Sequence, residues 1–566
     1  MTQPPSDNSV PPRRKEPSLS PPAYVLNRHN SRVLDPTTAQ LFEGQRIRPT
    51  VFVGANLLVH GELSATLRGM LNDAAGPDFE ISKKVDYDAE LLRLCRREDR
   101  RGQESGDYQD AAPAPDSLEA LAREILVSRV QIVPINPDQP LAPPDAWSVL
   151  QRFRAIARSK DRRLVDEVSL DHLMAANSTD DPSGFMGIGG FMGIGGFMGI
   201  GGFMGIGGVS TPSQTYGLAG QGGREPVAFL GAEPNRCKDA DWVGRRPVVA
   251  ILDTGAGSHR WLPNSIVNRR PRVGNLSIGM TDADGPNPET HSTLDDPLEG
   301  VLDPASGHGT FISGIIRQTC PDANILMIRV VHGDGAIPEW DFLRALNRLT
   351  VRQAIAIKHQ RPELLVDVVS LSLGYYHELP AAVAFDSHLI RPLRHLGRLG
   401  AVVVACAGND ATSRHMYPAG FAPHSGSRLK VVADACPVVS VGAYNPNLRT
   451  KAMFSNDGDW VSCFRVGAAV VSCLPSTMNG SVQAAASVSL THRGRRATID
   501  PDDFRGGFAV WSGTSFASPV LAGEILSQIA ASTNKDVIDR DTVVARGWAA
   551  VTATAKVKRP PAAKTS

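Results

Sequence analysis

Short apolar runs alternate with helix-patterned segments through the second half of the chain. Between residues 227 and 556 these runs are rich in β-branched residues and read RPVVAILDTG, NILMIRVV, VDVVSLSLG, GAVVVACAGN and CPVVSVGAYN. The segment EWDFLRALNRLTVRQAIAIKHQ, which lies between two of them, has the apolar spacing of a helix. Apolar strands that alternate with helices are typical of an α/β fold, in which helices cover both faces of a parallel sheet.

A smaller α/β domain is predicted over residues 46–176. RPTVFVGANLLVHGELSATLRGMLNDA reads as strand, turn and helix, DSLEALAREILVSRVQIVPI as helix then strand, and PPDAWSVLQRFRAIARS as a helix. A charged loop around CRREDRRGQESGDYQD interrupts the domain. The domain contains no chemical motif, so a regulatory or inhibitory role and a role in partner recognition both stay open.

Three segments have biased composition. Residues 1–45 are rich in proline and are predicted to be disordered, and residues 557–566 form a basic tail. Residues 177–226 form a Gly-rich linker in which FMGIGG occurs four times in tandem, from Phe185 to Gly208. A flexible tether is the first interpretation, because ordering so many glycines is costly. An uncharged membrane span of 24 residues and strand-to-strand self-association are the alternatives.

Bulk properties exclude some classes of partner. The 566 residues carry a formal net charge of +1, which gives no general attraction to nucleic acid or to an anionic membrane, so neither nucleic-acid binding nor stable membrane insertion is expected. The seven cysteines form no CxxC pair, which favours buried free thiols in a reducing compartment. The N-terminus has no apolar signal region, so a cytoplasmic location is predicted.

Four polar residues follow strands or begin helices in the 227–556 region. Asp253 ends VVAILD, His308 lies in SGHGTFISGIIR, Asn409 follows VVVACAG, and Ser515 lies in SGTSFASPVLAGE. Each alone reads as a turn or capping residue, and Ser515 in particular has the position of an N-cap. Ligands of parallel sheets bind beyond the carboxyl ends of the strands, however, and an acid, a base and a nucleophile occur here in that order.

These motifs resemble those of the subtilisin-like serine peptidases, or subtilases, over about 330 residues. The resemblance implies a serine endopeptidase that acts on polypeptides. In it, the His308 imidazole takes the proton of the Ser515 hydroxyl, and the Asp253 carboxylate orients that imidazole. The Asn409 amide and the backbone N–H of Ser515 are the implied donors of the oxyanion hole.

The resemblance also implies where a substrate binds. The segment SLSLG pairs its backbone with an extended peptide, and AG precedes Asn409 on the other wall of the pocket, which leaves room for a large apolar side chain. The implied substrate-binding residues are Ser372, Leu373, Gly374, Ala407 and Gly408. Calcium sites recur in this family, but no ligand set can be matched here, so no metal ligand and no cofactor are assigned.

The sequence departs from the family pattern in two motifs. HGTFISG has Phe311 where many subtilases have a second histidine, and PVLAGE replaces the usual HVAG after the nucleophile. Neither change removes a catalytic group, although both bear on local helix packing. A stretch before Ser515, STMNGSVQAAASVSLTHRGRRATIDPDDF, reads as an inserted surface loop.

Two hypotheses about activity follow. The first is an active endopeptidase that also cuts its own FMGIGG linker, whose Phe and Met side chains suit an apolar pocket. The alternative is a signalling or binding protein whose peptidase domain is inert or makes one specific cut. Inhibition or self-association through the N-terminal domain or the repeat is compatible with either.

Overall fold

The computed structural model describes residues 16–17, 19, 21–39, 47–101, 114–138, 140–176, 213, 216, 218, 220–379, 388–427 and 429–561. The FMGIGG repeat, most of the predicted linker and the last five residues of the predicted basic tail lie outside the described residues. None of the described helices is both long enough and apolar enough to cross a membrane.

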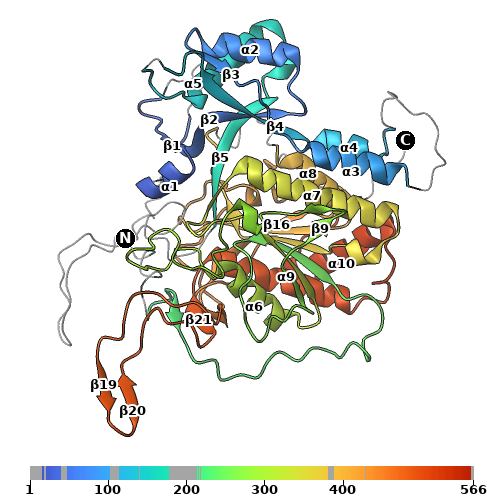
Figure 1. Ribbon diagram of the computed structural model, residues 1–566. Coiled ribbons are helices and arrows are strands. Elements are labelled where there is room, and N and C mark those ends of the chain that lie inside the picture. The colour runs from blue at the N-terminus through green and yellow to red at the C-terminus, as the bar shows by residue number, and fades with distance from the viewer. Residues whose placement is uncertain are drawn as a thin grey trace, which may run out of the picture.

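A seven-stranded parallel sheet forms the centre of the larger domain, as predicted (Figure 1). Its strands, in spatial order, are β17 (Cys463–Val466), β16 (Val438–Tyr444), β15 (Val402–Cys406), β13 (Val368–Leu371), β7 (Val248–Asp253), β11 (Asn324–Arg329) and β8 (Val267–Asn268). Every neighbouring pair is parallel. The four residues of β13 and the five of β15 are all buried, which explains why these strands read as continuous apolar runs.

Helices cover both faces of this sheet (Figure 1). On one face lie α6 (His308–Thr319), α9 (Thr514–Ala530) and α10 (Arg540–Ala555), and on the other lie α7 (Glu339–Lys358) and α8 (Ile390–Arg398). The helix α7 has Glu339 and Asp341 in its first turn and Lys358 in its last, which complements the helix dipole. The parallel sheet with helices on both faces is therefore confirmed.

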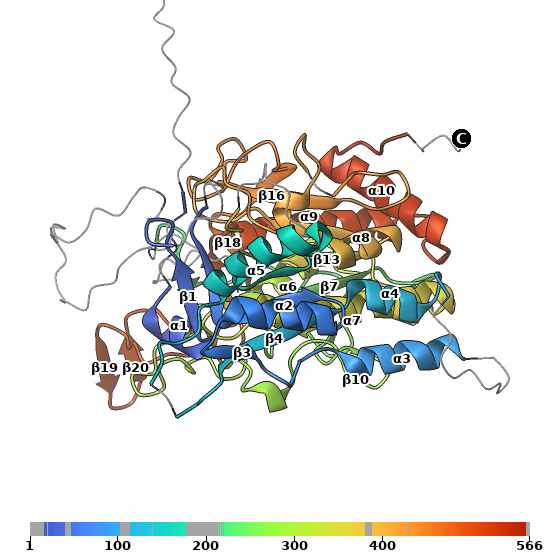
Figure 2. The ribbon, with the colours of Figure 1, turned by 90° about the horizontal axis from the view of Figure 1, so that it is seen from above.

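The N-terminal domain is an antiparallel sheet covered by helices. Its strands are β1 (Ser31–Leu34), β2 (Thr50–His60), β3 (Phe79–Ile81), β4 (Val127–Pro134) and β5 (Val168–Ala176), with β2 at the centre. Two helices, α2 (Ala65–Ala75) and α5 (Ala146–Lys160), lie side by side across it (Figure 2). The pair α3 (Ala89–Asp99) and α4 (Leu118–Ile125) packs instead on α7 of the larger domain.

The two domains share one sheet and one core. Strand β5 continues the N-terminal sheet into the larger domain by pairing with β12 (Ala336–Pro338) and β14 (Leu373–Gly374). One hydrophobic cluster holds side chains of the N-terminal domain together with those of α7, α8 and β13, and a second cluster holds α6 and α9. The N-terminal domain is thus packed into the larger domain rather than tethered beside it.

Several local expectations were wrong. Part of the predicted disordered segment forms α1 (Ala23–Arg28) and β1, because β1 pairs along β2 and buries Leu34. The interrupting loop begins as a helix, since α3 extends to Asp99. The end of the predicted linker contains β6 (Glu225–Pro226), which pairs with β21 (Phe508–Trp511).

The stretch expected to be an inserted loop contains a hairpin instead. Its strands, β19 (Ser487–Leu490) and β20 (Gly494–Ala497), consist of exposed residues and project from the molecule (Figure 1). The hairpin lies between β18 (Val470–Cys473) and β21 in the sequence, and these two strands pair with each other. A second small hairpin joins β9 (Arg272–Val273) and β10 (Leu276–Ser277).

Candidate active site

The four predicted catalytic residues lie at the carboxyl edge of the parallel sheet. Asp253 is the last residue of β7, Asn409 follows β15, His308 is the first residue of α6, and Ser515 is the second residue of α9. All four side chains are fully buried. Strand ends and helix starts meet at this edge because every strand of the sheet runs in the same direction.

Asp253 and His308 are hydrogen-bonded to each other. The Nδ1 of His308 lies 2.8 Å from Oδ1 of Asp253, and the same oxygen accepts the backbone N–H of Thr254 at 2.8 Å. The other ring nitrogen of His308, Nε2, has no hydrogen-bond partner among the described residues. A carboxylate at Nδ1 leaves Nε2 as the nitrogen that can accept a proton.

An aromatic cluster holds the histidine ring. Phe516, the residue after Ser515, lies 5.3 Å from the His308 ring, and Trp511 meets that ring edge-on at 5.8 Å. Phe311, the departure from the family pattern, packs on Phe516 at 4.5 Å. The departure therefore adds an apolar contact behind the imidazole, which helps to fix the plane of the ring.

Ser515 is placed by an unusual helix start. Pro519 lies within α9 and has no N–H, so the carbonyl of Ser515, four residues earlier, receives no helical hydrogen bond from it. The hydroxyl of Ser372 donates to that carbonyl at 3.0 Å instead. In return, the Ser515 hydroxyl donates to the carbonyl of Ser372 at 3.2 Å. The two contacts tie the start of α9 to the segment between β13 and β14.

The side chain of Asn409 is fixed through its oxygen. Its Oδ1 accepts both the backbone N–H and the hydroxyl of Thr514 at 2.9 Å, while its Nδ2 has no partner among the described residues. Gly408 precedes it with φ of +101°, and a Cβ there would lie 2.4 Å from Nδ2 of Asn456, so the position requires glycine. An amide held by its oxygen presents its N–H groups for another acceptor.

The predicted substrate segment is occupied by another part of the chain. Leu373 and Gly374 form β14, which pairs with Ala176 and Ala175 of β5 in antiparallel register. The N–H of Ala176 donates to the carbonyl of Gly335 at 2.8 Å, so the end of β5 also pairs on its other side. Ser372, which adjoins this strand, is buried.

The predicted pocket walls, Ala407 and Gly408, are also buried, and Met416 lies against Gly408. A Cβ on Gly408 would lie 2.8 Å from Sδ of Met416, and one on Gly374 would lie 2.9 Å from Cε of the same methionine. Met416 therefore lies against both sides of the predicted pocket. The space for a large apolar side chain is narrower than the small wall residues suggest.

Glu289 was also missed, because it lies in a loop without a motif. Its carboxylate is 2% exposed and accepts the hydroxyls of Thr254 and Thr310, each at 2.5 Å. Burial raises the pKa of Glu289 to about 7, with the charge of Asp253 adding to the effect and the two hydroxyls opposing it. A carboxyl with a pKa of about 7 thus contacts Thr254, the residue that follows the predicted acid Asp253.

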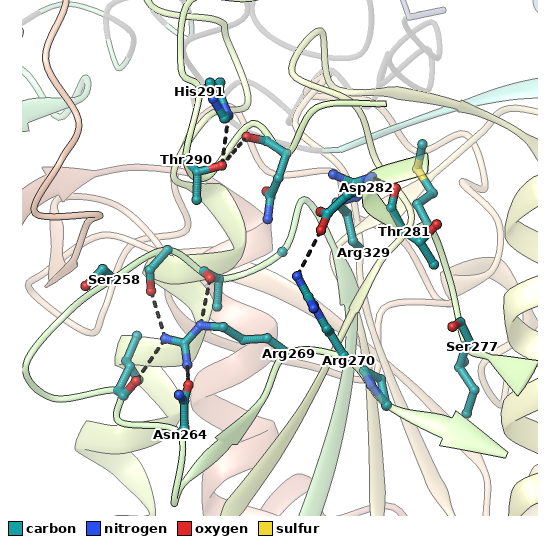
Figure 3. A pocket seen from close by; sticks show the side chains of 18 of the residues that line it. Ser258, Asn264, Arg269, Arg270, Ser277, Thr281, Asp282, Thr290, His291 and Arg329 are labelled. Atoms are coloured by element: carbon teal, nitrogen blue, oxygen red, sulfur yellow. Dashed lines mark hydrogen bonds and ion pairs between the residues drawn. The ribbon is translucent and has the colours of Figure 1, made fainter. Parts of the chain in front are cut away.

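A cavity of about 920 Å³ is lined in part by Gly255, Ala256 and Gly257, the segment that follows Thr254 (Figure 3). Arg269 supports its wall by donating to the carbonyls of Ala256, Gly257 and Leu262. Thr290 and His291 of the Glu289 loop line the same cavity. The loop that carries Glu289 therefore contributes both to the surroundings of the candidate site and to the wall of this cavity.

One group of side chains among the described residues has ligand atoms close enough for a metal ion: His172, His377 and Glu378. The geometry disfavours a metal there. Nδ1 of His377 accepts the N–H of Leu379 at 3.0 Å, and both ring nitrogens of His172 face carboxylates. Carboxylates only accept, so His172 must carry both ring protons and is an imidazolium.

The charge of His172 is stabilised across the domain boundary. Its Nδ1 lies 2.7 Å from Glu339 and its Nε2 lies 2.9 Å from Glu378, both in the larger domain. Burial alone would lower the pKa of His172, but the hydrogen bonds and charges of the two glutamates raise that pKa to about 9. The contact therefore joins β5 to the segments at the starts of α7 and after β14.

A family model described as "Subtilase family" matches residues 244–554. Solved structures that resemble the chain include the patellamide maturation protease PatA, with 18% identity over 53% of this chain and 85% of that chain and a TM-score of 0.32. A lanthipeptide protease has 17% identity over 53% and 78%, with a TM-score of 0.34. A cold adapted subtilisin-like serine proteinase has 18% identity over 56% and 86%, with a TM-score of 0.29. The comparison with curated proteins found no match.

Proposed function

Because the chain belongs to the subtilase family and is a serine endopeptidase, we propose that it hydrolyses peptide bonds with Ser515 as nucleophile. His308 takes the proton of the Ser515 hydroxyl and returns it to the leaving amine. Asp253 holds the imidazole in the required tautomer and stabilises the imidazolium. Asn409 Nδ2 and the backbone N–H of Ser515 donate to the oxyanion of the tetrahedral intermediate.

The observation that carries the proposal is the buried Asp253–His308 hydrogen bond of 2.8 Å, in which Nδ1 faces the carboxylate. Both side chains are 0% exposed, and burying such a pair without function would cost stability. Asn409 supports the same assignment, because Thr514 holds its oxygen and leaves its amide nitrogen available. Substrate would bind along Ser372, Leu373 and Gly374, with Ala407 and Gly408 beside the residue that precedes the cut.

A fluorophosphonate probe tests the assignment directly. The wild-type chain should be labelled once, on Ser515, and Ser515→Ala should not be labelled. Ser527→Ala is the matched control, since Ser527 lies in the same helix but its hydroxyl contacts the carbonyl of Thr319 rather than Ser515. Labelling of Ser515→Ala at the wild-type rate would overturn the proposal, as would labelling of the wild type at another residue.

We further propose that the N-terminal domain inhibits the peptidase by filling its substrate strand. The end of β5 lies between β12 and β14 and pairs with both, which is the backbone position that an extended substrate would take. The shared hydrophobic cluster and the buried His172 contact support the docking. So does Arg348, which forms two hydrogen bonds with Asp88 at 2.6 and 3.0 Å across the boundary.

The same register bears on self-processing. Ala176 pairs with Leu373, so the chain leaves the described part of β5 next to Ser372, whose carbonyl accepts the Ser515 hydroxyl. We therefore place the proposed self-cleavage in the first residues of the linker 177–226, ahead of the FMGIGG repeat at 185–208. Such a cut is also compatible with the alternative hypothesis. In that case the chain is a signalling or binding protein whose one specific cut is in its own linker.

Mass mapping of the chain ends after incubation distinguishes these cases, with Ser515→Ala as the control. New ends between residues 177 and 184 support the register argument. New ends within 185–208 would show instead that the repeat is the substrate. If the linker stays intact while a test peptide is hydrolysed, the self-processing proposal is wrong and the peptidase acts on other polypeptides.

The cysteines support the proposed cytoplasmic location. All seven are free thiols, and five of them are buried. Burial raises the pKa of Cys436 to about 12, so its thiol stays protonated and unreactive at neutral pH. Free thiols in such numbers are typical of a reducing compartment. Fractionation of the source cells, with the chain detected by antibody, tests the location.

A further inference from the structure

Glu289 lies between two threonines that each adjoin a member of the proposed triad. Thr254 follows Asp253, and Thr310 lies two residues after His308. The Glu289 carboxylate contacts the hydroxyl of each at 2.5 Å, and all three side chains are buried. A change in the protonation of Glu289 is therefore felt first by these two hydroxyls.

Counting hydrogens decides how the Thr254 hydroxyl can point. Its oxygen accepts the N–H of Gly309 at 2.9 Å, and its one hydrogen can go to Glu289 at 2.5 Å or to Asp253 Oδ1 at 3.1 Å. Thr310 has no such choice, because its oxygen accepts the N–H of Gly257 at 2.7 Å and its hydrogen faces Glu289. Thr254 is thus the only one of the two threonines that can switch acceptors.

We propose that Glu289 is a positioning residue of the catalytic site, whose protonation state decides whether the Thr254 hydroxyl donates to Glu289 or to Asp253. When Glu289 is ionised, it accepts both threonine hydroxyls, and Asp253 Oδ1 keeps the N–H of Thr254 and the His308 ring as donors. When Glu289 is protonated, its own O–H donates to Thr254, which then donates to Asp253. This inference rests on the proposed roles of Asp253, His308 and Ser515.

The surroundings permit this switch near neutral pH. The charged and titratable groups that face Glu289 are Asp253 from β7, His308 from α6 and Arg269 from the cavity wall. Arg269 is bound to backbone carbonyls and to Asn264, so it forms no ion pair with Glu289. With the pKa of Glu289 raised to about 7 by burial, both states are populated between about pH 6 and 8.

Protonation of Glu289 should lower the activity of the site. A third donor on Asp253 lowers the basicity of its carboxylate, so Asp253 stabilises the His308 imidazolium less well. The protonated form of Glu289 is therefore the less active one. Activity should therefore rise as Glu289 ionises.

Glu289→Gln fixes the less active arrangement. The amide oxygen accepts from Thr310, the amide nitrogen donates to Thr254, and Thr254 then donates to Asp253; the opposite orientation would leave the Thr310 hydroxyl without an acceptor. The rate of fluorophosphonate labelling of Ser515 should match wild type near pH 6 and fall about fivefold below it near pH 8.5, the effect of one hydrogen bond. Glu299→Gln, an exposed residue of the same loop region, is the matched control and should follow wild type at every pH.

Two outcomes would overturn the inference. A constant ratio between Glu289→Gln and wild type at all pH values would mean a purely structural role. A difference that persists unchanged in a Thr254→Val background would mean that the hydroxyl does not transmit it.

A readout without catalysis separates this inference from the proposed function. In the full chain carrying Ser515→Ala, the downfield NMR signal of the His308 Nδ1 proton should show one more titration step with Glu289 than with Glu289→Gln. Labelling of Ser515→Ala at the wild-type rate would refute the proposed nucleophile, and the NMR titration would still decide the role of Glu289. Identical titrations in the two chains would refute the switch.

Discussion

Replacing His172 with glutamine removes the charge that joins β5 to the peptidase domain. The imidazolium donates one N–H to Glu339 and the other to Glu378, and all three side chains are at most 1% exposed. The glutamine amide can donate to one of these carboxylates, but its oxygen then faces the other. The variant therefore leaves a buried carboxylate without a donor, and the docked state of β5 should be destabilised.

The size of the effect can be estimated in two ways. The pKa of His172 rises from 6.5 to about 9 on docking, which corresponds to about 3 kcal/mol of stabilisation at neutral pH. Breaking a buried ion pair by removing one partner typically costs about 3–5 kcal/mol. The two estimates agree, and they predict that β5 opens at least about 100-fold more often in the variant than in wild type.

The same shift predicts the pH dependence of docking. Because the docked pKa of His172 is raised, its contribution is fully present below about pH 6.5 and is lost as the pH rises through about 9. Acid does not produce the same release in the mild range, because the pKa of Glu378 is held far below its usual value by His377, His172 and Arg154 despite its burial. The contact should therefore open toward alkaline pH.

Amide hydrogen exchange of the β5 peptide measures this opening without catalysis. We would use the full chain with Ser515→Ala, compare His172 with His172→Gln between pH 6 and 9, and correct for the intrinsic exchange rates. His60→Gln is the matched control, because His60 contacts Glu167 at 3.0 Å in the same sheet but is partly exposed. Equal protection in His172→Gln and wild type would refute the reasoning, as would an equal loss in His60→Gln.

Other substitutions test the site and the fold. Asn409→Ala should lower kcat by about 100- to 1000-fold in steady-state peptide hydrolysis, and a smaller effect on kcat than on KM would contradict its oxyanion role. Gly309→Ala should destabilise the chain in thermal unfolding, because the new Cβ would lie 2.1 Å from the carbonyl of Gly255; a wild-type melting temperature would contradict this close approach. Arg348→Ala should increase exchange of α3 and β5 by leaving Asp88 buried without its ion pair, whereas Arg344→Ala, one turn earlier in α7, should not.

The candidate site could be read from the sequence because each of its residues occurs in a short local motif. Asp253, His308, Asn409 and Ser515 stand at strand ends and helix starts, and the parallel sheet brings those ends to one edge. Glu289 could not be read in this way, because it lies in a loop without a motif. Met416 begins the segment MYPAGF, but only folding places these two residues beside Thr254 and Gly408.

The packing of the two domains on each other was the second feature that could not be predicted from the sequence. The strand that contains His172, VSLDHLMAA, matches no motif, and nothing in it indicates that its last residues pair with Ala336–Pro338 and Leu373–Gly374. Pairing between segments that are about 160 to 200 residues apart leaves no local periodicity in either segment. The same holds for β1, whose pairing with β2 overrode a composition that favoured disorder.

The sequence by itself determined the α/β alternation, the order of the predicted acid, base and nucleophile, and the glycines beside them. Each of these features depends only on residues within a short stretch of the chain. The tertiary structure decided which groups surround those residues: the strand that pairs with Leu373 and Gly374, the His172 ring between two glutamates, and the Glu289 carboxyl that contacts Thr254. These depend on burial and on the charge of distant segments, and burial sets the protonation of a group only after the chain has closed around it.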